Sequence, residues 1–129
     1  MIGILLITHG TFGESLIQNV CHVLNKHPPL IGQLGFAAQD DPLDMLPLAR
    51  LRLNEVDEGD GVLIMTDMLG ATPSNLCLKL LVPGRVEGVA GASLPMLLRV
   101  LTYRQCSMEI LLQKALSGGH DGVICLPLH

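Results

Sequence analysis

Short aliphatic runs alternate with helix-start signals along the whole chain, and this alternation constrains the fold more than any other feature. The runs have the length and apolar content of buried strands, and they lie at residues 2–8, 30–36, 61–66 and 86–90. Strands that alternate with helices form a parallel sheet with helices on both faces, which keeps both sides of each strand apolar. The sequence therefore predicts an α/β fold with an open, mainly parallel four-stranded sheet in the order 2-1-3-4.

Each predicted helix begins at a residue that can cap it or at a proline that suits its first turn. Thr11 and Glu14 have the spacing of a capping box, in which two side chains satisfy free backbone donors at a helix start. A proline follows both Asp41 and Thr72, and proline is well suited to the first helical position. The five helices should start near Thr11, Asp41, Thr72, Ser93 and Ser107.

Prolines and glycines predict where several elements break or end. Pro47 lies inside the second helix, where proline removes a hydrogen bond and clashes with the preceding turn. That helix should therefore be broken or start late, and it should end near Val56. The third helix should end at about Leu81, and Gly118 with Gly119 should end the last one. The apolar residues 122–126 predict a fifth short strand, which would form an exposed sheet edge unless it were paired.

The length and composition fit one domain, residues 1–129, with an aliphatic core. Hydrophobic residues make up 49% of the chain and aromatic residues only 2%. The apolar runs are too short to span a bilayer, and the first residues lack the order of a secretory signal. The protein is therefore expected in the cytoplasm.

Charge and cysteine content argue against two classes of function. The formal net charge is -4 and the basic residues are scattered, whereas nucleic acid requires clustered Lys and Arg. No two cysteines form a C-x-x-C pair, so neither a metal site nor a redox dithiol is expected. The cysteines lie in apolar stretches and are expected to be buried, reduced thiols. They are Cys21, Cys77, Cys106 and Cys125.

His9 and Asp67 lie at the ends of two predicted strands. In an open parallel sheet, ligands bind beyond the carboxyl ends of the strands, where the strand order reverses. The predicted order places that reversal between the first and third strands, and adjacent strands lie about 4.8 Å apart. Because His9 ends the first strand and Asp67 follows the third, we expect their side chains to be within reach of each other.

A histidine paired with a carboxylate can act as a nucleophile. The carboxylate accepts a hydrogen bond from one ring N–H, which fixes the tautomer and leaves the other nitrogen free to attack phosphorus. Gly10 and Gly70 permit a close approach of the backbone, and Thr72 has a hydroxyl that can donate to a phosphoryl oxygen. Transfer between two histidines needs mainly positioning and electrostatics, with no obligatory organic cofactor.

Structural roles compete with these functional interpretations. A lone histidine at a strand end is more often a hydrogen-bonded structural residue, and Thr72 can serve only as a helix cap. Ser93 is interpreted as a cap, because Pro95 stands where the hydrolase G-x-S-x-G elbow has its second glycine. Structural roles are also assigned to the remaining histidines, His22, His27, His120 and His129.

Three blocks of sequence resemble the mannose-type IIA family of the bacterial sugar phosphotransferase system (PTS). They are residues 4–10, 61–75 and 89–97. In the family, the first block carries the phosphorylated histidine after a short strand. The second follows the pattern of an aliphatic strand, Asp, a glycine, Ser or Thr, Pro and Asn, and the third is close to G-x-x-x-P-M-L. The order and spacing of the blocks make the resemblance specific.

The resemblance implies a phosphoryl carrier. His9 corresponds to the phosphoryl acceptor, Asp67 to the acid that orients it, and Thr72 to a residue that helps hold the phosphoryl group. Family members receive this group from the phosphocarrier HPr and pass it to a IIB protein, and they meet the membrane only through transporter subunits. They are homodimers in which the C-terminal strand crosses to the partner. Met68 and Ala71 depart from the family, where Thr and Gly are frequent at these positions.

Several functions remain open on the sequence. The first is a carrier for a sugar transporter, and the second is a regulatory phosphocarrier without its own transporter. The third is the phosphotransfer subunit of dihydroxyacetone kinase, which resembles the family in fold and histidine. The loop from Gly70 to Asn75 matches the mannose type more closely than the kinase subunit. A simple phosphate- or nucleotide-binding module is a more distant fourth.

Overall fold

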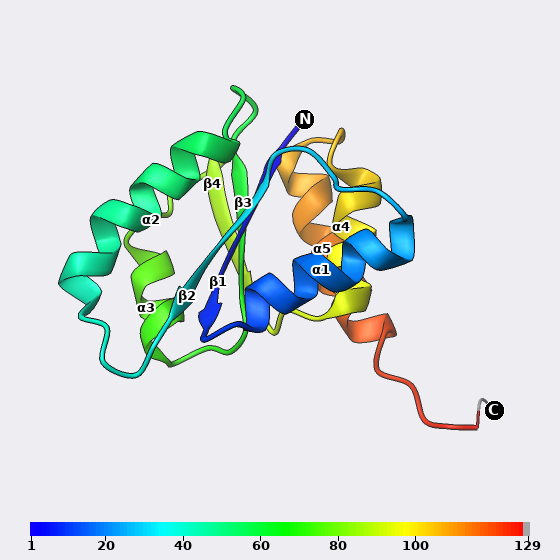
Figure 1. The fold of residues 1–129 in the computed structure, drawn as a ribbon. Coiled ribbons are helices and arrows are strands. Elements are labelled where there is room, and N and C mark those ends of the chain that lie inside the picture. The colour runs from blue at the N-terminus through cyan, green and yellow to red at the C-terminus, as the bar shows by residue number, and fades with distance from the viewer. Residues whose placement is uncertain (128–129) are drawn as a thin grey trace.

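The computed structural model describes residues 1–127 and contains a four-stranded sheet between two layers of helices (Figure 1). The strand order is β2-β1-β3-β4, and every neighbouring pair is parallel. This confirms the predicted fold class and strand order. The strands are β1 (Gly3–His9), β2 (Ile31–Phe36), β3 (Val62–Thr66) and β4 (Val86–Ala90).

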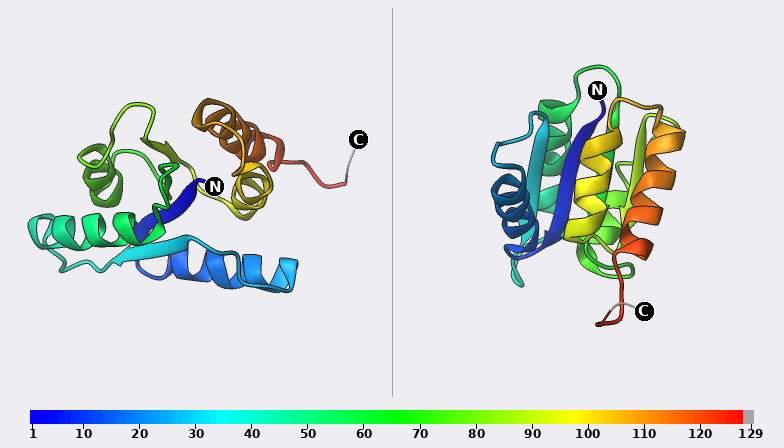
Figure 2. Two further views of the ribbon diagram at one scale, coloured as in Figure 1. Left: turned by 90° about the horizontal axis from the view of Figure 1, so that it is seen from above. Right: turned by 90° about the vertical axis from the view of Figure 1, so that its right-hand side faces the viewer.

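Helices cover both faces of the sheet, as Figure 2 shows from two further directions. One face carries α1 (Phe12–Leu24), α4 (Leu94–Tyr103) and α5 (Met108–Asp121), and the other carries α2 (Pro42–Val56) and α3 (Thr72–Leu78). Strand side chains alternate between the two faces. Ile4 and Leu6 of β1 therefore join the core on the first face, while Leu5 and Ile7 join the core on the second.

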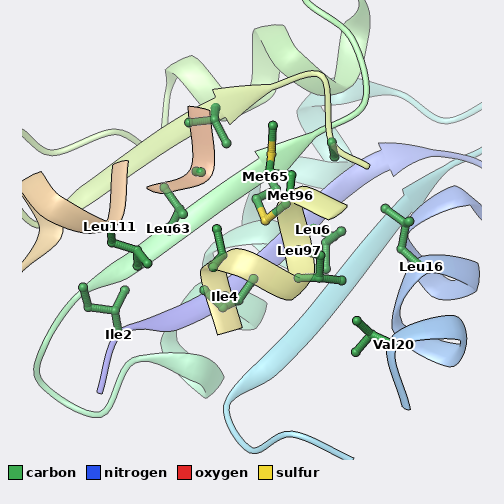
Figure 3. Close-up of a cluster of buried hydrophobic side chains, with 14 residues drawn as sticks. Ile2, Ile4, Leu6, Leu16, Val20, Leu63, Met65, Met96, Leu97 and Leu111 are labelled. Atoms are coloured by element: carbon green, nitrogen blue, oxygen red, sulfur yellow. The ribbon is translucent and has the colours of Figure 1, made fainter. Parts of the chain in front are cut away.

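The core beneath α1, α4 and α5 is aliphatic, as the composition predicted (Figure 3). Leu6 of β1 and Met65 of β3 face Leu97 of α4 in its centre, and all three side chains are fully buried. Full burial of one such side chain contributes roughly 1.5–3 kcal/mol to the free energy of unfolding. These contacts hold β1 and β3, the two central strands, in fixed register.

The prediction for Pro47 is wrong, because α2 runs without a break from Pro42 to Val56. Pro47 lies on the exposed side of the helix, and Leu43, whose carbonyl loses its helical donor, is also exposed. Water can reach this carbonyl, so the missing hydrogen bond is partly replaced. On the opposite side, Met45 and Ala49 are buried against the sheet and hold the helix in place.

Gly118 and Gly119 do not end the last helix, since α5 continues to Asp121. Their role is close packing between α4 and α5. A Cβ atom on Gly118 would lie 2.9 Å from Cβ of Arg99, and one on Gly119 would lie 2.8 Å from Cε of Met96. At Gly118 the contacting atoms lie at the base of Arg99 and cannot easily move, which explains a glycine inside a helix that it weakens intrinsically. At Gly119 the contacting atom is the tip of the flexible Met96 side chain, which could shift. The third helix also differs, ending at Leu78 and not near Leu81.

The predicted fifth strand is absent from the single chain within residues 1–127. After α5, residues 123–127 form no strand and run away from the body of the protein (Figure 1). Cys125 lies on this segment and is exposed, so the expectation of four buried thiols is wrong for it, whereas Cys77 is buried. Among the described residues, no helix is long and apolar enough to cross a membrane.

Candidate functional site

The carboxyl ends of the four strands open at the lower edge of the sheet in Figure 1. His9 is the last residue of β1, and Asp67 directly follows β3. The register of the two strands pairs Ile7 with Thr66. Beyond this pair β3 ends, while Thr8 and His9 continue β1 beside β2, so His9 and Asp67 lie at the reversal of strand order that the sequence predicted.

The structure brings His9 and Asp67 into direct contact. Nδ1 of the His9 ring lies 2.8 Å from Oδ2 of Asp67, and the backbone N–H of His9 donates to the same oxygen at 3.0 Å. The other carboxylate oxygen, Oδ1, accepts the N–H of Met68 at 3.1 Å. The side chain of His9 is 49% exposed, whereas that of Asp67 is 15% exposed. The carboxylate is thus fixed by backbone donors, while the ring beside it is open to solvent.

The charge of Asp67 determines the tautomer of His9. Partial burial acts to raise the pKa of Asp67, but the hydrogen bonds from the backbone and ring of His9 outweigh it, so this pKa lies below its ordinary value. An ionised carboxylate can only accept hydrogen bonds. Nδ1 of His9 must therefore carry the proton, and in the neutral ring the lone pair lies on Nε2. A half-exposed ring with a free Nε2 is a nucleophile that another protein can reach.

Gly10 and Gly70 both lie in loops at the carboxyl ends of the strands. Both have positive φ angles, 49° for Gly10 and 84° for Gly70, and a Cβ on either would meet no atom within 4 Å. The left-handed backbone of the two loops therefore favours glycine at both positions, and their role beside a phosphoryl group stays a prediction. The N–H of Gly10 donates to the carbonyl of Phe36 at 2.7 Å, so it is already occupied.

Thr72 is the first residue of α3 and not its cap. The cap position belongs to Ala71, whose N–H donates to Oγ of Ser74 at 3.1 Å. Thr72 is exposed and, together with His9 and Phe36, lines a cavity of about 320 Å³ beside the histidine. Thr72 thus borders the space beside the His9 ring.

Sequence reasoning missed Thr8, and it placed the cap of α1 on the wrong residue. Thr11 makes no side-chain cap, and the expected capping box with Glu14 is absent. The hydroxyl of Thr8, at the end of β1, accepts the N–H of Gly13 at 2.8 Å in its place. One signal in the sequence was available, because Thr8 is a polar residue at the end of an otherwise aliphatic run that is followed closely by a helix start.

The remaining sequence assignments concern Ser93 and the other histidines. Ser93 accepts the N–H of Met96 at 3.3 Å, which confirms its interpretation as a cap. Nδ1 of His27 contacts the carbonyl of Pro28, and His120 lies beside Asp121. His22 is exposed on α1. His129 lies outside the described residues.

Comparisons with known proteins show the family of this chain. A family model, described as PTS system fructose IIA component, matches residues 3–115. The mannose-specific EIIAB component of the PTS of Escherichia coli strain K12 is 27% identical over 128 residues. That alignment covers 97% of this chain but only 39% of the relative, so the chain spans well under half the length of the curated relatives it matches.

Two solved structures have the same fold. The phosphotransferase system component EIIA of Streptococcus agalactiae superimposes with a TM-score of 0.85 at 22% identity and covers 97% of both chains. The mannose/sorbose-specific IIA subunit of Enterococcus faecalis gives a TM-score of 0.87 at 19% identity, covering 99% of this chain and 96% of that one. Because the family model matches most of the sequence, this chain belongs to the EIIA-man family, the PTS system fructose IIA component.

Proposed function

We propose that this protein is a cytoplasmic phosphoryl carrier of the sugar phosphotransferase system. It accepts a phosphoryl group from HPr on Nε2 of His9 and passes it to a IIB component. The observation that carries the proposal is the 2.8 Å contact between Nδ1 of His9 and Oδ2 of Asp67 at the carboxyl ends of the central strands. Family membership supports the same chemistry.

The proposed transfer needs no proton to leave the attacking nitrogen. The lone pair on Nε2 of His9 attacks the phosphorus carried by HPr, and the phosphorus–nitrogen bond to HPr breaks as the new bond forms. The His9 ring then has a phosphoryl group on Nε2 and a proton on Nδ1, and it is positively charged. Asp67 stabilises this charge through the hydrogen bond it already accepts, so little reorganisation is required. Passing the group to IIB reverses these steps.

The surroundings of His9 suit an exchange between two proteins. Because the ring is half exposed, a residue of a partner can approach Nε2 directly. Thr72 lines the cavity beside the ring, and its hydroxyl can donate to a phosphoryl oxygen. Such a donor favours the phosphorylated form without enclosing it, and an enclosed group would be inaccessible to the next acceptor.

The test is phosphorylation with phosphoenolpyruvate, enzyme I and HPr. We expect one acid-labile, base-stable phosphate per chain, and none in the His9→Ala variant. His120→Ala is a matched control, because His120 is also exposed and also lies beside a carboxylate, that of Asp121. A chase with a IIB protein should remove the label. Labelling of His9→Ala at the wild-type level would overturn the proposal.

A further inference from the structure

Thr8 directly precedes His9 and has a contact that the proposed chemistry does not use. Its side chain is fully buried at the end of β1, and its hydroxyl oxygen accepts the N–H of Gly13 in the first turn of α1. A helix is normally capped by the residue at its own N-cap position. In this protein that residue, Thr11, makes no side-chain cap, so the preceding strand caps the helix.

Gly13 makes this contact possible. A Cβ atom on Gly13 would lie 3.0 Å from Oγ1 of Thr8 and 3.2 Å from Cβ of Leu6. A larger residue would therefore force the side chain of Thr8 or the start of α1 to shift by a few tenths of an ångström. The glycine and the threonine act together, one by allowing the helix to approach and the other by bonding to it.

The hydrogen bond closes a short ring of chain that contains His9. Between Thr8 and Gly13 there are only four residues, of which His9 ends the strand and Gly10 begins the loop. The N–H of His9 donates to Asp67, and the N–H of Gly10 donates to the carbonyl of Phe36. The bond from Gly13 to Thr8 is a further restraint on this loop, and it acts on the loop's far end.

The exposure of His9 makes these backbone restraints important. Packing does little to hold its ring, because the side chain is 49% exposed. The ring stays on Asp67 through one hydrogen bond and through the position of its own backbone. Any relaxation of the loop therefore moves the ring relative to the carboxylate.

We propose that Thr8 is a positioning residue for phosphoryl transfer: its hydroxyl holds the start of α1 on the end of β1 and thereby holds the His9 ring on Asp67. The inference rests on the proposed function of His9. A purely structural cap would change only the stability of the protein. A positioning residue also changes the tautomer of His9 and the rate of transfer, because a displacement of about 1 Å can cost up to ~10²-fold in rate.

The test compares three full-length variants. Thr8→Val keeps the shape of the side chain and removes the acceptor, whereas Thr8→Ser keeps the hydroxyl. Ser107→Ala is the matched control, because it removes the cap of α5, which accepts the N–H of Ile110. Ser107 lies at the other end of the sheet, where it lines a cavity with Ile2.

Two measurements are made on each variant. Heteronuclear NMR of the ring nitrogens reports the tautomer of His9 in the unphosphorylated protein, and the initial rate of labelling by HPr reports transfer. For Thr8→Val we expect a reduced population with the proton on Nδ1 and a rate about tenfold lower. Thr8→Ser should stay within about twofold of the wild type. Ser107→Ala should lose stability but keep the wild-type spectrum and rate.

Three results would overturn the inference. They are a wild-type tautomer and rate in Thr8→Val, a failure of Thr8→Ser to restore them, and an equal change in Ser107→Ala. If Thr8→Val does not fold, Gly13→Ala is used in its place, because the added methyl group crowds the contact between Gly13 and Thr8 and leaves the hydroxyl in place. An unchanged His9 tautomer in Gly13→Ala would then count against the inference. If HPr labels neither the wild type nor any variant, the proposed function is wrong. The NMR comparison still shows in that case whether Thr8 positions the His9 ring.

Discussion

Asp67 holds His9 through a single carboxylate oxygen. Oδ2 accepts both the ring N–H and the backbone N–H of His9, at 2.8 and 3.0 Å. The two bonds fix the ring relative to its own backbone, because both end on one atom. The second oxygen accepts the N–H of Met68, so the carboxylate cannot rotate without losing a backbone donor. The pair is therefore ordered before any phosphoryl group arrives.

The first prediction concerns Asp67→Asn. Asparagine has nearly the same shape, but it lacks the negative charge that stabilises the phosphorylated ring. It can also rotate its amide toward the ring and favour the wrong tautomer, a change that is severe in the serine-protease triad. We expect transfer from HPr to slow by at least about tenfold, with a smaller Nδ1–H population by NMR.

Asp41→Asn is the matched control for this substitution. Asp41 caps α2 by accepting the N–H of Leu43, and asparagine caps a helix equally well. This variant should transfer at the wild-type rate, and thermal unfolding should show that both variants are folded. If Asp67→Asn also transfers at the wild-type rate with an unchanged tautomer, the two residues do not act as a unit.

The second prediction is a pH dependence of stability. Although partial burial acts to raise it, the pKa of Asp67 is lowered in the folded protein by the hydrogen bonds from His9. A carboxyl whose pKa is lower when folded stabilises the protein above its unfolded pKa, and this contribution is lost as the pH falls through the folded value.

The comparison is made between the wild type and Asp67→Asn, because other carboxylates contribute equally to both. The wild type should be the more stable protein near neutral pH, and the difference in melting temperature should shrink below about pH 4. If the difference in melting temperature stays constant down to about pH 3, the charge of Asp67 does not stabilise the folded protein.

The placement of His9 beside Asp67 could be expected from sequence because general rules govern it. Parallel strands end at one edge of a sheet, and the order 2-1-3-4 makes the first and third strands neighbours. The apolar runs and the helix starts were enough to indicate both facts. The rule needs no knowledge of side-chain contacts, which explains why the topology was predicted correctly.

Features that depend on contacts between distant elements could not be predicted. The role of Thr8 depends on how closely α1 approaches β1, which Gly13 allows. Gly118 is needed inside α5 because Arg99 of α4 lies against it. Local propensity assigns glycine to a helix end and threonine to a strand. It does not show which residue of another element each of them contacts, so these contacts could not be predicted. At Met68 it is the backbone N–H that donates to Asp67, so this contact does not depend on the side chain at that position.

The third prediction concerns Thr72. Thr72 lines the cavity beside His9 and is not the cap residue of α3, so its hydroxyl can serve a phosphoryl group. Thr72→Ala should lower the rate of transfer from HPr by about tenfold, since it removes one donor to developing charge. Thr72→Ser keeps that donor and should remain close to the wild type. Equal rates for all three proteins would exclude a role for the hydroxyl.

The fourth prediction is a homodimer. β4 lies at the edge of the sheet, and an apolar groove lined by Leu69, Leu78 and Gly88 runs beside it. In the single chain, the residues after α5 form no strand, although Val123 is 86% exposed and Leu126 is 84% exposed. Exposed apolar residues and an open sheet edge are both unfavourable in water.

A second copy would cover both the exposed apolar residues and the open sheet edge, because the segment 123–127 of each chain would pair with β4 of its partner and cover the groove. The test is light scattering at micromolar concentration on the full chain and on a variant ending at Gly122, which keeps the whole of α5. We expect the full chain to be a dimer and the shortened chain to be a monomer with a lower melting temperature. Leu43→Asp is the control, since Leu43 is 73% exposed on α2 and its replacement should leave the dimer intact. A full-length protein that is monomeric, or a shortened chain that remains dimeric, would show that residues 123–127 do not hold two copies together.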